Sequence, residues 1–196
     1  MKLIQQVLTP KISDKISILN QFVKTGVHSI FIGGKMANCF LMARQQKELL
    51  KPFSIETLPS KLTTQDKNEN QEFLNEVMLA EQIIDLAEEK KVSILLPEDF
   101  KVVSEFKSTS FENKTSPDFS KVLQLDLGEK TIAQFGEKFK GIENVFWNGP
   151  LGAYDHALCT SYAEGSLELA KLLFRKALLN PNFSVVIGGG DSAAIL

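Results

Sequence analysis

The fold is indicated by residues 183–192, which read FSVVIGGGDS. Four of the first five residues are apolar, and a short apolar run of this kind is typical of a buried strand. Three glycines at 188–190 then end the strand, and Asp191 and Ser192 are residue types that commonly precede a helix. A strand, a glycine turn and a helix start in this order predict one β–α unit of a parallel sheet.

The same pattern occurs three more times along the chain. Apolar runs at residues 28–32, 92–96 and 144–147 end at a glycine pair, at Pro97 and at the turn residues 148–150. Apolar positions at helical spacing predict helices over residues 14–23, 36–50, 73–87, 130–139 and 167–177. Alternating strands and helices predict an α/β fold with an open, mostly parallel sheet and helices on both faces, a Rossmann-like three-layer sandwich.

The remaining segments fit this pattern less closely. Two weaker strands are predicted at residues 101–103 and 122–125, around a polar stretch at 104–120. Residues 51–70 are rich in Ser, Thr, Pro and Lys and are predicted to form a long loop. Only about one helical turn of sequence follows Ser192, which is too short to form a stable helix alone. We therefore expect the sequence to be part of a longer protein.

Length and composition favour a single globular domain over residues 1–196. Of the 196 residues, 43% are hydrophobic and 23% are charged, values near the average of folded proteins. The 22 basic and 24 acidic residues give a net charge of -2, which disfavours a general nucleic-acid-binding protein. Cys39 and Cys159 are too few for a disulfide framework and are predicted to be buried thiols in a reducing compartment.

The sequence shows neither a secretory signal nor a membrane span. The start of the chain lacks the apolar stretch of a signal peptide. No run approaches the roughly 20 apolar residues that cross a bilayer. We therefore predict a cytoplasmic protein without a membrane partner or a nucleic-acid partner.

The glycine run at 188–190 permits two interpretations. Glycines let backbone amides approach a phosphate closely, and the start of the following helix adds a favourable dipole. Asp191 would repel a phosphate, so beside one it makes better sense as a ligand of Mg²⁺. The alternative is an ordinary strand–helix turn with Asp191 as the N-cap, and this segment alone weighs the two equally.

Other candidate anion contacts are ambiguous when each is taken alone. Lys11 and Lys15 are one helical turn apart and could reach the same anion, or could form a solvated basic face. The segment NGPLG at 148–152 could bring backbone close to a ligand or form an ordinary turn. Gly33 and Gly34 lack the spacing of a dinucleotide-binding fingerprint, and the sequence contains no P-loop motif. No group of Cys, His and carboxylate residues has zinc-site spacing.

Six motifs occur in a recognisable order: KISDKI (11–16), GGKMA (33–37), LLP (95–97), LDLG (125–128), WNGPLG (147–152) and GGGDS (188–192). In this order and approximate spacing they resemble the C-terminal, nucleotide-binding domain of the phosphoglycerate kinase family. The resemblance runs from about Leu8 to the last residue. It implies Mg²⁺-dependent transfer of a phosphoryl group between ATP and 3-phosphoglycerate, or between 1,3-bisphosphoglycerate and ADP in the glycolytic direction.

The resemblance also implies a role for each matched residue. Lys11 and Gly190 would act in catalysis, Lys11 by stabilising the phosphoryl group during transfer, and Asp191 would hold Mg²⁺. The implied nucleotide-binding residues are Lys15, Gly33, Gly34, Leu125, Asn148, Pro150, Asp155, Gly189, Gly190, Asp191 and Ser192. The phosphoglycerate would be bound by an N-terminal domain that has no counterpart in this sequence. We therefore expect the chain not to turn over on its own.

The sequence departs from the family pattern around the expected adenine pocket, which the first glycine pair would line. The family has glycine where Thr9, Lys35 and Gln124 stand here, and a longer glutamate where Asp155 would bind the ribose. A side chain in place of glycine opposes close backbone approach to a ligand. These departures favour a second hypothesis, that the chain is a diverged, non-catalytic module that binds nucleotide or forms oligomers. Binding of Mg-ADP would test the first hypothesis directly.

Overall fold

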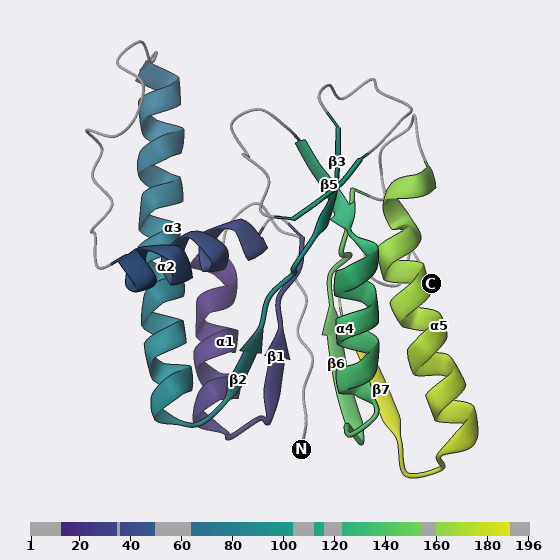
Figure 1. Cartoon of the computed structure of the whole chain (residues 1–196). Coiled ribbons are helices and arrows are strands. Elements are labelled where there is room, and N and C mark those ends of the chain that lie inside the picture. Colours follow the sequence, from purple (N-terminus) through teal and green to yellow (C-terminus); the bar gives the residue numbers. More distant parts are fainter. Residues whose placement is uncertain are drawn as a thin grey trace.

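Helices and strands are mixed along the whole described chain (Figure 1). The computed structural model describes residues 13–34, 36–49, 64–103, 112–115, 123–153 and 160–188. The elements in chain order are α1 (Ser13–Lys24), β1 (Ser29–Phe31), α2 (Met36–Leu49), α3 (Thr64–Glu89), β2 (Ser93–Leu95), β3 (Phe100–Val103), β4 (Glu112–Lys114), β5 (Leu123–Leu127), α4 (Glu129–Phe139), β6 (Asn144–Asn148), the 3-10 helix η2 (Thr160–Ala163), α5 (Glu164–Leu179) and β7 (Ser184–Gly188). This order confirms the predicted α/β class.

The described strands form three small sheets. β1 pairs with β2 and β6 pairs with β7, both in parallel. A parallel pair needs a long crossover connection, and helices supply it: α2 and α3 join β1 to β2, and α5 lies between β6 and β7. β3 lies between β4 and β5 and is antiparallel to both. The parallel pairs are those expected from β–α units, and the antiparallel strands add a second kind of pairing to them.

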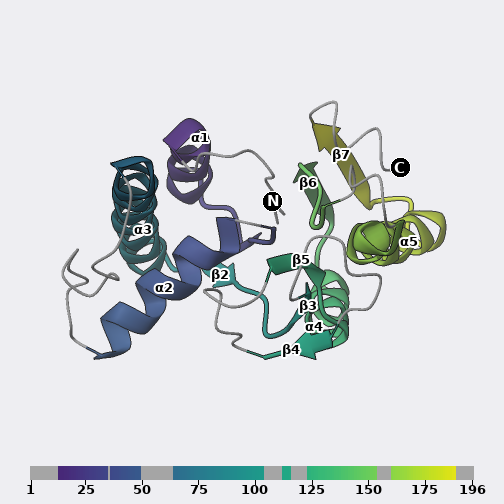
Figure 2. The ribbon, with the colours of Figure 1, turned by 90° about the horizontal axis from the view of Figure 1, so that it is seen from above.

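Successive residues of β1 and its end face two different hydrophobic cores. Ile30 and Ile32 belong to a core shared with α1, α2 and α3. Phe31 points to the opposite side, where its ring lies edge-on to Phe135 and Phe139 of α4, at centroid distances of 4.9 and 5.2 Å. Because side chains alternate along a strand, β1 lies between two layers of helices. Figure 2 shows α1, α2 and α3 on one side and α4 and α5 on the other, the predicted three-layer arrangement.

The predicted helices and strands are confirmed with small shifts at their ends, and two segments differ. The loop predicted over 51–70 is wrong at its end, because α3 begins at Thr64. Residues 64–70 contain neither glycine nor proline, and extending a helix already packed at 73–87 costs little per residue. No helix of the described residues is long and apolar enough to cross a bilayer.

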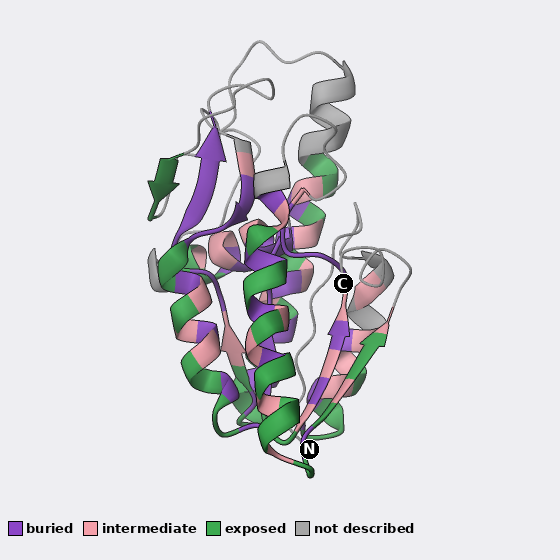
Figure 3. Cartoon of the chain, turned by 90° about the vertical axis from the view of Figure 1, so that its right-hand side faces the viewer, coloured by how far each residue is buried: buried purple, intermediate pink, exposed green. Residues whose placement is uncertain are grey.

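The second difference is β4, which lies inside the polar stretch predicted at 104–120. Its three residues are exposed, whereas β3 beside it is buried along its whole length (Figure 3). An exposed edge strand of this kind is stabilised mainly by backbone hydrogen bonds to its neighbour. These bonds leave no apolar pattern in the sequence, so composition could not reveal the strand.

Candidate functional site

The turn after β6 places two predicted site residues, Asn148 and Pro150. Asn148 is the last residue of the strand, and Gly149 follows it with φ of 96°, a left-handed conformation that favours glycine. The indole Nε1 of Trp147 donates a hydrogen bond of 2.6 Å to the carbonyl oxygen of Gly149. Gly149 and Pro150 are buried, so the turn packs against the protein interior.

The backbone that follows this turn is bound on two sides. The amide of Leu151 donates to the Ser166 hydroxyl in the first turns of α5, at 2.9 Å. The amide of Ala153 donates to the carbonyl oxygen of Leu125 in β5, at 2.8 Å. The structure therefore brings the predicted residue Leu125 beside the segment that carries Asn148 and Pro150.

A second glycine turn reaches the same strand. Gly33 and Gly34 are buried between β1 and α2, and Gly34 has φ of 59°. The Gly34 carbonyl oxygen accepts the side-chain amide Nε2 of Gln124 at 3.4 Å. The Gln124 Oε1 atom is buried and has no hydrogen-bond partner among the described residues. The side chain that replaces a family glycine therefore lies directly against the predicted adenine-pocket turn.

The remaining predicted residues are Lys15 and a group outside the described part of the chain. Lys15 is in the first turn of α1 and is partly buried. In the β6–β7 ladder Asn148 pairs with Gly188, the first glycine of the predicted phosphate-binding run. The predicted residues outside the described part of the chain are Lys11, Asp155, Gly189, Gly190, Asp191 and Ser192. Within the described part, no three His, Cys, Asp or Glu side chains are grouped to hold a metal ion.

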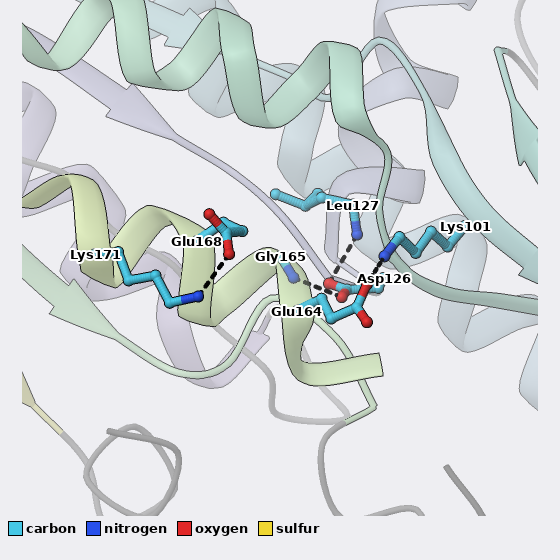
Figure 4. Close-up of polar contacts among 7 residues, drawn as sticks. All are labelled: Lys101, Asp126, Leu127, Glu164, Gly165, Glu168 and Lys171. Carbon is cyan, nitrogen blue, oxygen red and sulfur yellow. Dashed lines mark hydrogen bonds and ion pairs between the residues drawn. The ribbon is translucent and has the colours of Figure 1, made fainter. Parts of the chain in front are cut away.

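A buried carboxylate that the sequence analysis did not single out lies beside this site (Figure 4). Asp126 of β5 accepts the amide of Gly165 on Oδ2 at 2.7 Å and the amide of Leu127 on Oδ1 at 2.8 Å. Lys101 of β3 is also buried and pairs with Glu164, the first residue of α5. Burial raises the pKa of Asp126 to about 7, although both amides and the charge of Lys101 act to lower it.

A second buried aspartate, Asp99, lies just before β3. It accepts the amides of Thr131 on Oδ1 at 2.8 Å and of Lys130 on Oδ2 at 3.1 Å, in the first turn of α4. The Thr131 hydroxyl donates to Asp99 Oδ1 at 2.7 Å and accepts the Asp99 amide at 3.0 Å. Asp126 stands in the sequence as a single carboxylate between Leu125 and Leu127, and a charge in such an apolar run was the signal that could have revealed it. Asp99 follows Pro97 and Glu98 in a polar turn and gave no such signal.

Comparison with known proteins places this arrangement in a family. The sequence model of the family described as phosphoglycerate kinase matches residues 9–196. The phosphoglycerate kinase of Clostridium perfringens (strain SM101 / Type A) is 33% identical over 185 residues, covering 94% of this chain and 40% of that protein. The phosphoglycerate kinase of Elusimicrobium minutum (strain Pei191) is 34% identical over 190 residues, covering 95% of this chain and 41% of that protein.

Solved structures agree with the sequence comparison. Phosphoglycerate kinase from Coxiella burnetii has a TM-score of 0.73 at 25% identity, covering 99% of this chain and 43% of that one. Phosphoglycerate kinase from Pyrococcus horikoshii OT3 has a TM-score of 0.70 at 20% identity, again over 99% and 43%, and shares the fold. The chain spans about 40% of the length of its curated relatives. Because the family match covers nearly the whole sequence, the chain belongs to the phosphoglycerate kinase family.

Proposed function

We propose that this chain is the nucleotide-binding part of a phosphoglycerate kinase. It would bind ADP or ATP with Mg²⁺ and take part in phosphoryl transfer between 1,3-bisphosphoglycerate and ADP, or between ATP and 3-phosphoglycerate in reverse. The chain spans about 40% of its relatives, so we assign the phosphoglycerate site to a part of the protein outside this sequence. We expect the isolated chain to bind nucleotide in the cytoplasm without turning over.

The observation that carries the proposal is a series of three contacts that joins four predicted segments. Gly34 accepts a hydrogen bond from Gln124, beside Leu125 in β5. Leu125 accepts one from Ala153, in the segment that follows Asn148 and Pro150. Asn148 in turn pairs with Gly188 at the start of the glycine run. These contacts join segments that are distant in the sequence, which supports a common nucleotide site.

The backbone at these turns suits a nucleotide. Gly34 and Gly149 adopt left-handed conformations and carry no side chain, so a base or a ribose could lie directly against the main chain. The Gln124 side chain lies against Gly34, where its Nε2 donates one long hydrogen bond of 3.4 Å to the Gly34 carbonyl oxygen. Its other amide atom is buried without a partner among the described residues, which costs free energy. Displacing this side chain on binding is therefore inexpensive.

Phosphoryl transfer depends on positioning and on charge neutralisation, and the proposed residues serve these needs. Lys15 lies in the first turn of α1, where its amine would add to the positive helix dipole and hold a nucleotide phosphate. Lys11 and Gly190 would stabilise the group in transfer, and Asp191 would supply the carboxylate for Mg²⁺. When bound, Mg²⁺ neutralises phosphate charge and so favours the transfer.

Calorimetric titration with Mg-ADP tests the proposal. We expect saturable binding to the folded chain, and the Lys15→Ala variant should weaken it at least about tenfold because a charge-assisted contact to phosphate is lost. Lys24→Ala is the matched control, since Lys24 is exposed at the opposite end of the same helix. Absence of binding at millimolar Mg-ADP by a chain that is folded by circular dichroism would contradict the proposal. Equal losses in the two variants would contradict the role of Lys15.

One observation favours the second candidate function, a diverged module that does not take part in catalysis. Gln124, where the family has glycine, donates a hydrogen bond to Gly34 of the expected adenine pocket. If Gln124 only hinders binding, Gln124→Gly should tighten Mg-ADP binding severalfold in the same titration, about 1 kcal/mol. If neither the parent chain nor Gln124→Gly binds nucleotide, the second function is the better description.

A further inference from the structure

The start of α5 is attached to the rest of the protein through Asp126, which the proposed function does not use. The residue preceding this helix, Ala163, makes no side-chain capping bond. The amide of Gly165, one of the first amides of the helix, donates instead to Asp126 Oδ2 at 2.7 Å. The other carboxylate oxygen accepts the amide of Leu127 at 2.8 Å. Asp126 therefore joins the start of α5 to β5 through its side chain (Figure 4).

Two glycines allow this carboxylate to contact two other segments at once. A Cβ atom added to Gly165 would lie 2.5 Å from Asp126 Oδ1. One added to Gly152 would lie 2.6 Å from the same oxygen and 1.9 Å from the carbonyl oxygen of Tyr162. No side chain fits at either position, so the backbone itself packs against the carboxylate.

Gly152 belongs to the segment 148–153, which lies between the two elements that Asp126 joins. On one side the Leu151 amide donates to Ser166 of α5 at 2.9 Å. On the other side the Ala153 amide donates to Leu125 of β5 at 2.8 Å. The spacing of these two attachment points is set by how closely α5 lies to β5. A change in that spacing would move the segment.

We propose that Asp126 is a positioning residue for the nucleotide turn: by holding the start of α5 against β5, it fixes segment 148–153 in the conformation that presents Asn148 and Pro150. This proposal rests on the proposed function only where it assigns nucleotide contact to those two residues. Asp126 itself is buried and acts through the backbone. It is distinct from the predicted phosphate and metal ligands, which come from α1 and from the glycine run.

Burial of the Asp126 carboxyl makes the attachment of α5 to β5 depend on pH. Among the described residues, the charged side chains that face it are Lys101 from β3 and Glu164 from α5, and these two pair with each other. Segment 149–153 carries no titratable side chain, and η2 contributes the Tyr162 carbonyl near Gly152. Burial raises the pKa of Asp126 to about 7. Separation of α5 from β5 would rehydrate the carboxylate and lower its pKa, so the attachment is tighter when Asp126 is protonated and looser as pH rises through about 7.

Amide hydrogen exchange on the full chain tests the attachment directly. In Asp126→Ala, the protection factors of Gly165, Leu151 and Ala153 should fall at least about tenfold, because their attachment is lost. Asp99→Ala is the matched control: Asp99 is also buried and also accepts amides at a helix start, but at α4. It should lower protection at Thr131 and leave those three amides unchanged. Equal loss at the three amides in both variants would overturn the proposal.

The parent chain provides a test that needs no variant. The protection factor of the Gly165 amide, taken relative to the unfolded chain at each pH, should fall by up to about tenfold between pH 6 and pH 8. Asp126→Asn keeps one carbonyl acceptor and cannot ionise, so it should recover part of the protection lost in Asp126→Ala and remove the pH dependence. A Gly165 protection factor that does not change with pH in the parent chain would overturn the pH dependence of the attachment. If Asp126→Ala fails to fold, Leu151 and Ala153 amides whose protection does not follow that of Gly165 as pH changes would overturn the proposal.

Titration with Mg-ADP then links the attachment to the site. Asp126→Ala should weaken Mg-ADP binding at least about tenfold and Asp99→Ala less than twofold. If the parent chain binds no Mg-ADP, the proposed function fails, and the exchange experiments alone decide whether Asp126 positions the segment. If Asp126→Ala loses protection at Leu151 and Gly165 but binds Mg-ADP like the parent, the link between this residue and the nucleotide turn is overturned.

Discussion

The starts of α4 and α5 use the same capping device in two different settings. Gly128 and Ala163, the residues before these helices, make no side-chain capping bond. In each case a buried aspartate from a distant part of the chain accepts an amide of the first turn. Asp99 also receives the Thr131 hydroxyl, a side-chain donor from the helix that it caps. Among the described residues, Asp126 receives two backbone amides, those of Leu127 and Gly165.

The comparison separates a cap that builds the fold from one that also positions a site. The bonds of the Asp99 side chain go to the first turn of α4. Asp126 touches the segment 148–153 and the start of α5 together, through Gly152 and Gly165. The two aspartates make similar capping bonds. Only the Asp126 carboxylate also contacts segment 148–153, so only its loss is expected to affect that segment.

The largest expected effect comes from adding a methyl group beside each aspartate. Gly152→Ala should lower the free energy of unfolding by more than about 3 kcal/mol, because the new Cβ meets the backbone carbonyl of Tyr162 at 1.9 Å, which cannot rotate away. Gly128→Ala should cost about 2 kcal/mol, since its Cβ meets the Asp99 side chain, which can shift. Urea unfolding followed by circular dichroism measures both. A smaller loss of unfolding free energy for Gly152→Ala than for Gly128→Ala would contradict the tighter packing inferred around Asp126.

The next effect is the pH dependence that burial of Asp126 gives to stability. Its pKa is raised to about 7 in the folded protein. Asp126 is neutral in both states below its unfolded pKa, and the free energy of unfolding is highest there. The free energy of unfolding falls as pH rises through about 7, because the folded protein must then bury a charged carboxylate. The free energy of unfolding of the parent chain, relative to Asp126→Asn, should therefore fall by on the order of 2 kcal/mol between pH 5 and pH 8. Denaturation across this range is the measurement, and parallel curves for the two proteins would show that Asp126 does not titrate there.

The smallest effect comes from removing the hydrogen bond between the Ser166 hydroxyl and the Leu151 amide of segment 148–153. Ser166→Ala removes the acceptor of the buried Leu151 amide and should cost about 1 kcal/mol of stability. It should also weaken Mg-ADP binding severalfold, because one of the two attachments of the segment is lost. Thr131→Ala removes a buried hydroxyl at the corresponding place on α4 and serves as the control. Equal weakening of Mg-ADP binding in both variants would show that the loss comes from general destabilisation of the fold and not from the attachment of segment 148–153.

Much of the architecture could be predicted because it depends on local patterns. Periodic apolar residues fixed the helices, and short apolar runs ended by glycine or proline fixed most of the strands. The segments that escaped prediction had no such pattern. Residues 64–70 are helical because they extend a packed helix, and β4 exists because β3 offers it backbone partners.

For the candidate site too, some residues could be predicted from local patterns and others could not. Gly33, Gly34, Leu125, Asn148 and Pro150 could be singled out because glycine turns after strands have a recognisable sequence. Their meeting around β5 came from contacts such as that between Gln124 and Gly34, residues 90 positions apart. Asp126 and Ser166 were missed because a carboxylate or a hydroxyl has no special meaning until its burial and partners are known.

The sequence by itself determined the order of the elements, the glycine turns and the family, since these follow from residue types and their spacing along the chain. The tertiary structure alone decided that Asp126 is buried, that it caps a helix beginning at Glu164, and that its carboxyl titrates near neutral pH. The physical reason is that desolvation and hydrogen bonding depend on which atoms surround a group in space. For Asp126 the decisive atoms come from β3, α5 and the turn after β6, which meet only in the folded chain.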